Sequence, residues 1–132
     1  MSSSNKNMSS YDLASLPSAK QLRFGLVVSE WHSEITEAMY EGAVETLKKA
    51  GVQAKNIRRI SVPGSFELTQ GAQLFATMKK KPDAVLCIGC VIKGETKHFD
   101  FICQAVAEGI SNLGIIYGLP VIFGVLTTDN EE

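Results

Sequence analysis

The sequence predicts an α/β fold in which a parallel sheet of four strands has helices on both faces. Three apolar runs show no alternation of polar and apolar residues, which indicates strands buried on both faces. Stretches with helical periodicity separate these runs, so strands and helices are predicted to alternate along the chain. That order favours parallel strands joined by right-handed crossovers. The three buried strands are predicted at Phe24–Val28, Ala84–Ile92 and Pro120–Leu126.

An N-terminal segment and a fourth strand complete the predicted organisation. Residues 1–20 are rich in serine and lack periodic apolar positions, so we expect a flexible arm or a segment that orders only against a partner. The domain then covers residues 21–132, a length that suits a single core. Ile57–Val62 is the fourth predicted strand, and Arg58 and Arg59 indicate that it lies at a less buried edge.

Three helices are expected between the strands. Gly51 favours the end of the first helix, the Lys79–Pro82 segment favours the end of the second, and Gly114 is predicted to close the third. With these elements we expect a three-layer sandwich with the flavodoxin-like strand order 2-1-3-4. The apolar stripes consist of Ile35, Met39, Ala43, Leu47 and Ala50, of Leu68, Ala72, Phe75 and Met78, and of Phe99, Ile102, Val106, Ile110 and Leu113.

The last residues of the sequence have the features of a helix start. Thr128 suits the N-cap position, Glu131 follows three residues later, and acidic residues occupy the first turn. A doubly wound sheet also needs a helix after its last strand to cover one face. We therefore expect the sequence to be a truncated form of a longer parent.

Composition argues against several classes of partner and site. A formal net charge of −1 gives no reason to expect nucleic acid or an anionic membrane as a partner. Cys87 and Cys90 form a CxxC that could be half of a redox or metal site, but inside an apolar run cysteine usually serves as a small hydrophobe. A secretory signal and an apolar stretch long enough to span a bilayer are both missing, so we expect a cytoplasmic protein without a metal.

Polar segments follow all four predicted strands. In open parallel sheets, ligands bind outside the carboxyl ends of the strands, so these segments should meet at one edge of the sheet. Each of them is rich in groups that a polar ligand needs. The segments are Ser29–Ser33, Pro63–Glu67, Lys93–His98 and Thr127–Asp129.

The Lys93–His98 segment has the features of a phosphate site. Gly94 permits a tight turn, and the amides that follow would lie at the N-terminus of the third helix, where they and the helix dipole can hold a phosphate. An ordinary loop with Thr96 as N-cap is an equal alternative. His98 would lie in the first helical turn, where the dipole favours a neutral imidazole that can accept a proton. An isolated histidine there is more often a solvent-facing residue.

Three further residues have two interpretations each. Glu67 can accept hydrogen bonds from a polyol or simply favour a helix N-terminus. The Trp31 indole can stack on a flat heterocycle or lie at the edge of the core. Phe123 lies in an apolar strand, where core packing is the first expectation. The convergence of these residues on one sheet edge favours a small-molecule site for a planar ring, a polyol and a phosphate.

Three strings resemble the signatures of one family, the 6,7-dimethyl-8-ribityllumazine synthases. The strings are VPGSFEL (Val62–Leu68), GCVIKGETKHFDFI (Gly89–Ile102) and PVIFGVLTTDNEE (Pro120–Glu132), and their order and spacing match as well. The resemblance runs from about Arg23 to the last residue.

The resemblance implies an activity. Members condense 5-amino-6-(D-ribitylamino)uracil with 3,4-dihydroxy-2-butanone 4-phosphate in the penultimate step of riboflavin biosynthesis, without a metal or redox cofactor. An amine attacks a ketone to form an imine, phosphate is eliminated, and the ring closes with loss of water. Members are homopentamers, and some assemble into icosahedral shells of sixty subunits.

The resemblance also implies a role for individual residues. His98 corresponds to the general acid/base, and Phe123 to an aromatic ring supplied to the site of a neighbouring subunit. The family continues into a helix with an arginine and a lysine that lie beyond Glu132, so we expect weaker phosphate binding. The remaining implied contacts are Trp31 and His32 at the pyrimidine, where many members have Asn at the second position, Val91 and Ile92 lining the pyrimidine site, Ser65, Phe66 and Glu67 at the ribityl chain, and Gly94, Glu95 and Thr96 at the phosphate.

Two alternatives belong to other functional classes. A truncated or engineered self-assembling shell protein with impaired catalysis would explain the missing arginine, although Trp31, Glu67 and His98 are retained. A flavin- or nucleotide-binding module would need a phosphate loop after the first strand. The segment SEWHSEIT lacks the glycines or repeated Ser/Thr of such a loop, which disfavours this alternative.

Overall fold

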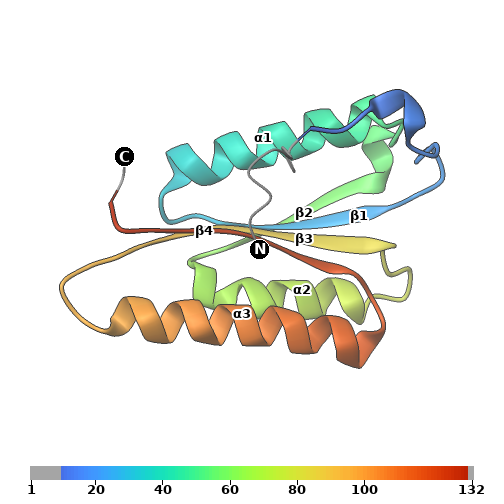
Figure 1. Ribbon diagram of the computed structural model, residues 1–132. Coiled ribbons are helices and arrows are strands. Elements are labelled where there is room, and N and C mark those ends of the chain that lie inside the picture. The colour runs from blue at the N-terminus through green and yellow to red at the C-terminus, as the bar shows by residue number, and fades with distance from the viewer. Residues whose placement is uncertain (1–9, 131–132) are drawn as a thin grey trace.

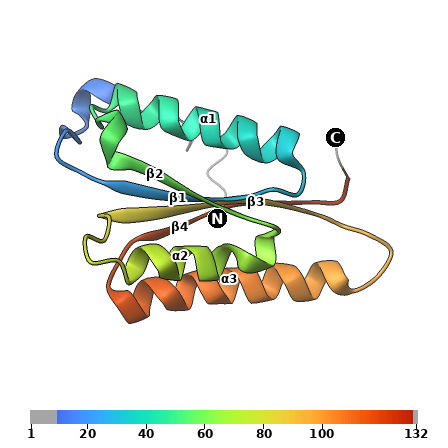
Figure 2. The same ribbon diagram turned by 180° about the vertical axis from the view of Figure 1, so that it is seen from behind.

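One parallel sheet lies between two layers of helices in the computed structural model, which describes residues 10–130 (Figure 1). The strand order is β2-β1-β3-β4, which confirms the predicted order, and every pairing is parallel. Helix α1 covers one face, and α2 and α3 lie side by side on the other (Figure 2). The elements are β1 (Phe24–Ser29), α1 (Ser33–Lys49), β2 (Ile57–Val62), α2 (Leu68–Ala76), β3 (Ala84–Ile92), α3 (His98–Tyr117) and β4 (Val121–Thr128), with short 3-10 helices η1 (Leu13–Ser15), η2 (Ala54–Asn56) and η3 (Ser65–Glu67).

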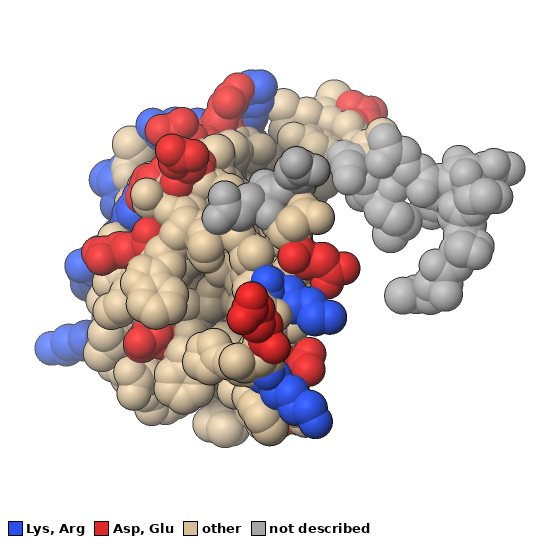
Figure 3. All heavy atoms as spheres, turned by 90° about the vertical axis from the view of Figure 1, so that its left-hand side faces the viewer, with Lys and Arg blue, Asp and Glu red and all other residues tan. Residues whose placement is uncertain are grey.

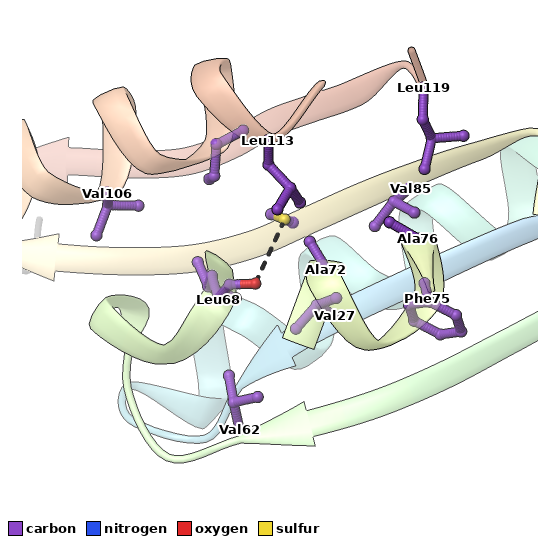
Figure 4. Close-up of a cluster of buried hydrophobic side chains, with 12 residues drawn as sticks. Val27, Val62, Leu68, Ala72, Phe75, Ala76, Val85, Val106, Leu113 and Leu119 are labelled. Atoms are coloured by element: carbon purple, nitrogen blue, oxygen red, sulfur yellow. Dashed lines mark hydrogen bonds between the residues drawn. The ribbon is translucent and has the colours of Figure 1, made fainter. Parts of the chain in front are cut away.

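Two apolar cores hold the layers together. On the side of α2 and α3, Leu68 and Phe75 are packed against Val27 and Val85 of the sheet (Figure 4). On the other side, α1 packs on a smaller core that contains Leu26. Each of these side chains is almost completely buried, and burial of one such side chain stabilises the fold by about 1.5–3 kcal/mol.

The last strand is less buried than the sequence predicted. Ile122, Phe123 and Leu126 are 48%, 44% and 44% exposed, so β4 is not covered on both faces. The reason is its position, because β4 is an edge strand whose helix contacts are with α3. The unbroken apolar run of β4 therefore does not indicate burial on both faces within this subunit.

The third helix continues past the predicted stop at Gly114. It ends at Tyr117, and Gly118 adopts the left-handed conformation (φ 59°, ψ 38°) that favours glycine at this position. Gly114 instead serves close packing, because a Cβ there would lie 3.1 Å from the Leu119 carbonyl oxygen. The prediction was wrong because a glycine can serve either purpose, and Gly118 was overlooked.

Helix α3 also corrects the expectation that no segment could cross a membrane. It has 20 residues and a mean hydropathy of 1.2 over its most apolar window, so it satisfies length and composition criteria for a membrane span. Its buried residues Val106, Ile110 and Leu113 belong to the core beside α2. This packing accounts for part of its apolar composition, because Phe101, Ile115 and Ile116 of the same helix remain exposed.

The described part of the N-terminal segment contacts the domain. The Ala19 amide donates to the Ala50 carbonyl at 3.1 Å, and the Ala19 side chain is buried. Asp12 caps η1 by accepting a hydrogen bond from the Ala14 amide. Residues 1–9 of the predicted arm lie outside the described residues, so the prediction of a flexible arm stays a prediction there.

Thr128 is the last residue of β4, and its hydroxyl donates to the Asn130 carbonyl at 2.6 Å. Glu131, the other half of the predicted helix start, lies outside the described residues. A helix after β4 therefore remains a prediction.

Candidate active site

A cavity of about 520 Å³ opens at the carboxyl edge of the sheet. Figure 3 looks onto this edge, where uncharged side chains make up much of the surface. Four stretches of chain line the cavity, namely the segment after β1, the turn with η3 after β2, the end of β3, and the loop that leads into the first turns of α3. The lining residues are Trp31, His32, Pro63, Gly64, Ser65, Phe66, Glu67, Cys90, Val91, Ile92, Gly94, Thr96, His98, Phe99 and Ile102.

Trp31 is held at the cavity by its backbone. The Glu30 amide donates to the Val62 carbonyl at 2.8 Å, and the Trp31 amide donates to the Pro63 carbonyl at 3.1 Å, so the ends of β1 and β2 are joined. The indole lies beside Gly64, where a Cβ would be 3.8 Å from the ring. Because the indole is 69% exposed, its surface is available to a flat ligand.

His32 connects β1 to α1 in an unusual conformation. It is the N-cap of α1 and lies in the left-handed region (φ 59°, ψ 47°), which costs a non-glycine residue energy. Its carbonyl accepts hydrogen bonds from the Ile35 and Thr36 amides. The buried Thr36 hydroxyl donates to the Ser29 carbonyl at 2.8 Å, which fixes the helix start to the strand end.

The helix η3 forms one wall of the cavity. Ser65 is buried, and its hydroxyl donates to the Cys90 carbonyl across 3.5 Å, a long hydrogen bond. Phe66 is 61% exposed at the cavity, and Glu67 is half-buried there. The Glu67 amide donates to the Gly64 carbonyl at 3.2 Å, which closes the turn. An aromatic ring, a carboxylate and a backbone turn therefore lie along this wall.

The loop between β3 and α3 forms the opposite wall. The Lys93 amide donates to the Thr128 carbonyl at 2.8 Å, which extends the β3–β4 pairing by one residue. The Thr96 hydroxyl accepts a hydrogen bond from the His98 amide at 3.3 Å, but the N-cap of α3 is Lys97, so the alternative of Thr96 as N-cap was wrong. Within residues 10–130 the amides of Gly94 and Glu95 donate to no protein group, and both residues are exposed. The loop thus leaves amides available to an anion.

The structure brings ten of the twelve predicted site residues to this cavity. Glu95 and Phe123 do not line it. Glu95 is exposed in the loop, and Phe123 is on β4 beyond β3. Sequence reasoning missed Cys90, Phe99 and Ile102, all of which were assigned to apolar core patterns. The signal was their position, because they lie at the carboxyl end of β3 and in the first turns of α3.

The CxxC is not a reactive pair. Cys87 and Cys90 are three residues apart on β3, so their side chains point to opposite faces of the sheet. Burial raises the pKa of the Cys87 thiol to about 12, which keeps it protonated and unreactive. Cys87 belongs to the core beside α2, where its sulfur lies 4.0 Å from the Leu68 carbonyl oxygen. In the described part of the chain, no group of three or more His, Cys, Asp or Glu residues could hold a metal ion.

Comparison with known proteins connects this cavity to a family. Residues 21–132 match the family model described as 6,7-dimethyl-8-ribityllumazine synthase. A protein of that name from Cytophaga hutchinsonii is 58% identical over all 132 residues, which cover 82% of the relative. Proteins of the same name from Flavobacterium psychrophilum and Parabacteroides distasonis are each 49% identical over the whole chain, which covers 69% and 82% of their lengths.

These relatives carry the name of an enzyme, so they give no support to the shell-protein alternative. The matched region contains the whole sheet, its three helices and every residue that lines the cavity. With such identity and coverage, the chain belongs to the 6,7-dimethyl-8-ribityllumazine synthase family.

Proposed function

We propose that the cavity condenses 5-amino-6-(D-ribitylamino)uracil with 3,4-dihydroxy-2-butanone 4-phosphate to form 6,7-dimethyl-8-ribityllumazine. The observation that carries this proposal is the meeting of three kinds of group in one cavity. An exposed indole, a turn with a carboxylate, and a helix start with free amides suit a flat ring, a polyol and a phosphate. A volume of about 520 Å³ lies in the range typical of small-molecule sites, about 300–1,000 Å³.

The pyrimidine binds between apolar surfaces. Trp31 stacks on the ring, since an exposed indole offers a large flat contact at low entropic cost. Val91 and Ile92, half-buried at the end of β3, contact the ring edge. His32, beside Trp31, contributes a polar contact that its imidazole can make as donor or acceptor.

The ribityl chain lies along η3. Its hydroxyl groups donate to the Glu67 carboxylate, and backbone groups of Ser65 and Phe66 complete their hydrogen bonds. A charged acceptor strengthens such bonds relative to a neutral one. The wall that holds the chain is thus separate from the loop that holds the phosphate.

The phosphate of the second substrate binds at the start of α3. Amides of Gly94, Glu95 and Thr96 donate to its oxygens, and the dipole of a 20-residue helix favours its negative charge. Gly94 has open space where a Cβ would lie, so a ligand can approach the backbone closely.

His98 moves protons between the two substrates. The 5-amino group attacks the ketone carbon, and loss of one water gives the imine. Loss of the phosphate dianion follows removal of a proton from the adjacent carbon, and ring closure releases a second water. His98 accepts and returns protons in these steps, because it lines the cavity beside the phosphate loop. Holding both reactants together supplies much of the rate gain.

The activity is tested by incubating the chain with both substrates. We expect 6,7-dimethyl-8-ribityllumazine, identified by its mass, and one inorganic phosphate for each product molecule. Omitting either substrate is the control and should give neither. If the chain binds both substrates without forming the product, the proposed function is wrong.

We further propose a homo-oligomer, a pentamer or a larger assembly of pentamers, in which Phe123 reaches the cavity of a neighbouring subunit. Phe123 is 44% exposed and lies outside its own cavity. Exposed apolar side chains continue on α3, where Phe101, Ile115 and Ile116 are 68%, 77% and 73% exposed. Exposed apolar surface of this kind marks protein interfaces. A sedimenting species of monomer mass would contradict the proposal.

A further inference from the structure

Gly89 in β3 lies where a side chain would collide with the cavity wall. A Cβ at this position would be 2.5 Å from the Ser65 hydroxyl oxygen and 2.9 Å from the Cδ1 atom of Leu68. The Ser29 hydroxyl oxygen would be 3.4 Å away. These three neighbours are 7%, 0% and 0% exposed, so none of them can turn into solvent to make room. Only glycine therefore permits η3 to lie as close to β3 as it does.

The contact matters because η3 presents ligand-binding groups. Ser65 begins this helix, and Phe66 and Glu67 follow it along the cavity wall. The hydrogen bond from the Ser65 hydroxyl to the Cys90 carbonyl draws the same wall toward β3. A methyl group at position 89 would push Ser65 away and carry the wall with it, because η3 is too short to deform independently.

We propose that Gly89 is a positioning residue, which fixes the distance between η3 and β3 and thereby aligns the wall that binds the ribityl chain. The proposal rests on the proposed function, because it assigns the ribitylaminouracil to this wall. It does not involve the phosphate loop, where Gly94 and Thr96 lie beyond the end of β3.

Gly25 provides a matched control on the neighbouring strand. A Cβ there would lie 2.7 Å from the Phe75 ring, so Gly25→Ala also overpacks a buried site. Gly25 is paired with Val85 near the amino end of the sheet and does not line the cavity. Both substitutions should therefore lower the midpoint of thermal unfolding, by roughly several degrees. They should differ only in their effect on the cavity.

The test is calorimetric titration of the wild-type, Gly89→Ala and Gly25→Ala chains with 5-amino-6-(D-ribitylamino)uracil, and separately with inorganic phosphate. We expect Gly89→Ala to bind the pyrimidine about tenfold more weakly, because a displaced η3 would lose a hydrogen bond to the ribityl chain. Its phosphate affinity should stay within about twofold of wild type. Gly25→Ala should bind both ligands like wild type. If Gly89 had only a structural role, Gly89→Ala would weaken the binding of both ligands equally, and that result would overturn the proposal.

Removing the closest obstacle provides a rescue. In Gly89→Ala combined with Ser65→Ala, the added methyl no longer meets a hydroxyl at 2.5 Å, although the Leu68 contact at 2.9 Å remains. Adding Gly89→Ala to Ser65→Ala should therefore weaken pyrimidine binding by a smaller factor than adding Gly89→Ala to wild type. An equal loss of pyrimidine binding on adding Gly89→Ala in both backgrounds, or loss of folding in both chains that carry Gly89→Ala, would overturn the proposal. Absence of pyrimidine binding by wild type would instead overturn the proposed function, and this inference with it. Equal binding by wild type and Gly89→Ala would overturn the inference alone.

Discussion

His98 lies where backbone and side chain have separate roles. Its amide is occupied by the Thr96 hydroxyl, while its imidazole faces the cavity from the first residue of α3. The residue is therefore fixed at its backbone and open at its ring. This separation suits a group that moves protons without holding either substrate.

We expect His98→Ala to lower turnover about 100-fold or more, in the range of lost general acid–base catalysis. The affinity for each substrate, measured separately by calorimetry, should change little, because the stacking and phosphate contacts involve other residues. His32→Asn is the control, since it removes the other histidine of the cavity and asparagine tolerates the left-handed conformation found there. Wild-type turnover in His98→Ala would show that His98 only begins the helix.

Cys87 makes a second residue-scale prediction, on pH. In the unfolded chain its thiol ionises with an ordinary pKa of about 8.5, whereas burial raises the folded pKa to about 12. The folded state therefore holds more protons above about pH 8.5, and its stability falls as the pH rises toward about 12. Urea unfolding of wild type should show a steeper loss of unfolding free energy over that range than Cys87→Ala does. Parallel pH profiles of the two chains would contradict this.

Residue patterns alone identified the cavity residues at the ends of elements, whereas Val91 and Ile92 inside β3 were expected only from the family resemblance. Trp31, Glu67 and His98 follow strands or begin helices, where polar or aromatic side chains stand out against an apolar pattern. Phe99 and Ile102 were assigned to the core because they share the apolar stripe of α3. The first turns of α3 extend past the sheet, so the same stripe faces the cavity there. The pattern alone does not say where core ends and cavity begins.

At the scale of the element, the Thr36 hydroxyl joins α1 to β1. Thr36→Val should lower the free energy of unfolding by about 1–3 kcal/mol, because the Ser29 carbonyl loses its buried donor. Thr46→Val in the same helix is the matched control, since the Thr46 hydroxyl only donates to the Gly42 carbonyl of its own helix at an exposed position. It should cost about 0.5 kcal/mol or less. Equal urea midpoints for both variants would show that the Thr36 bond adds nothing.

Most elements could be predicted from periodicity, and the exceptions have physical causes. The bounds of β2 and β3 agree with the prediction, because Pro63 follows β2, and the charged residues Asp83 and Lys93 flank β3. The end of α3 was missed because Gly114 permits close packing in mid-helix. The helix η3 was not predicted at all, because its three residues are too few for a periodic pattern. The exposure of β4 follows from its place at the edge of the sheet, and the amino-acid composition of a strand does not reveal its place in the sheet.

At the scale of the whole molecule, the proposal that a site is shared between subunits makes a prediction about mixtures. His98→Ala and Phe123→Ala chains should each have low activity alone. When they are unfolded, mixed and refolded together, activity should return, because about a quarter of the sites in a closed ring would combine an intact His98 with a neighbour's intact Phe123. Turnover measured before and after mixing checks this. Phe123 is 44% exposed, so its loss should leave the fold of the subunit intact.

Mixing wild type with Phe123→Ala is the control, since every site there has an intact His98 and the total number of intact sites is the same before and after mixing. Failure of the two inactive chains to complement each other would place Phe123 outside the neighbour's site. The exposed apolar surface of β4 would then need an explanation other than a shared site.

The amide hydrogen bonds that join the ends of β1 and β2 have a consequence for hydrogen exchange. The Glu30 and Trp31 amides are held by the Val62 and Pro63 carbonyls, although the Trp31 indole is among the most exposed apolar groups. Deuterium should therefore enter slowly at Trp31 and quickly at Gly94 and Glu95, on the opposite wall. One wall of the cavity is then rigid before any substrate binds, whereas the loop on the opposite wall becomes protected from exchange only when the substrate that carries the phosphate binds there.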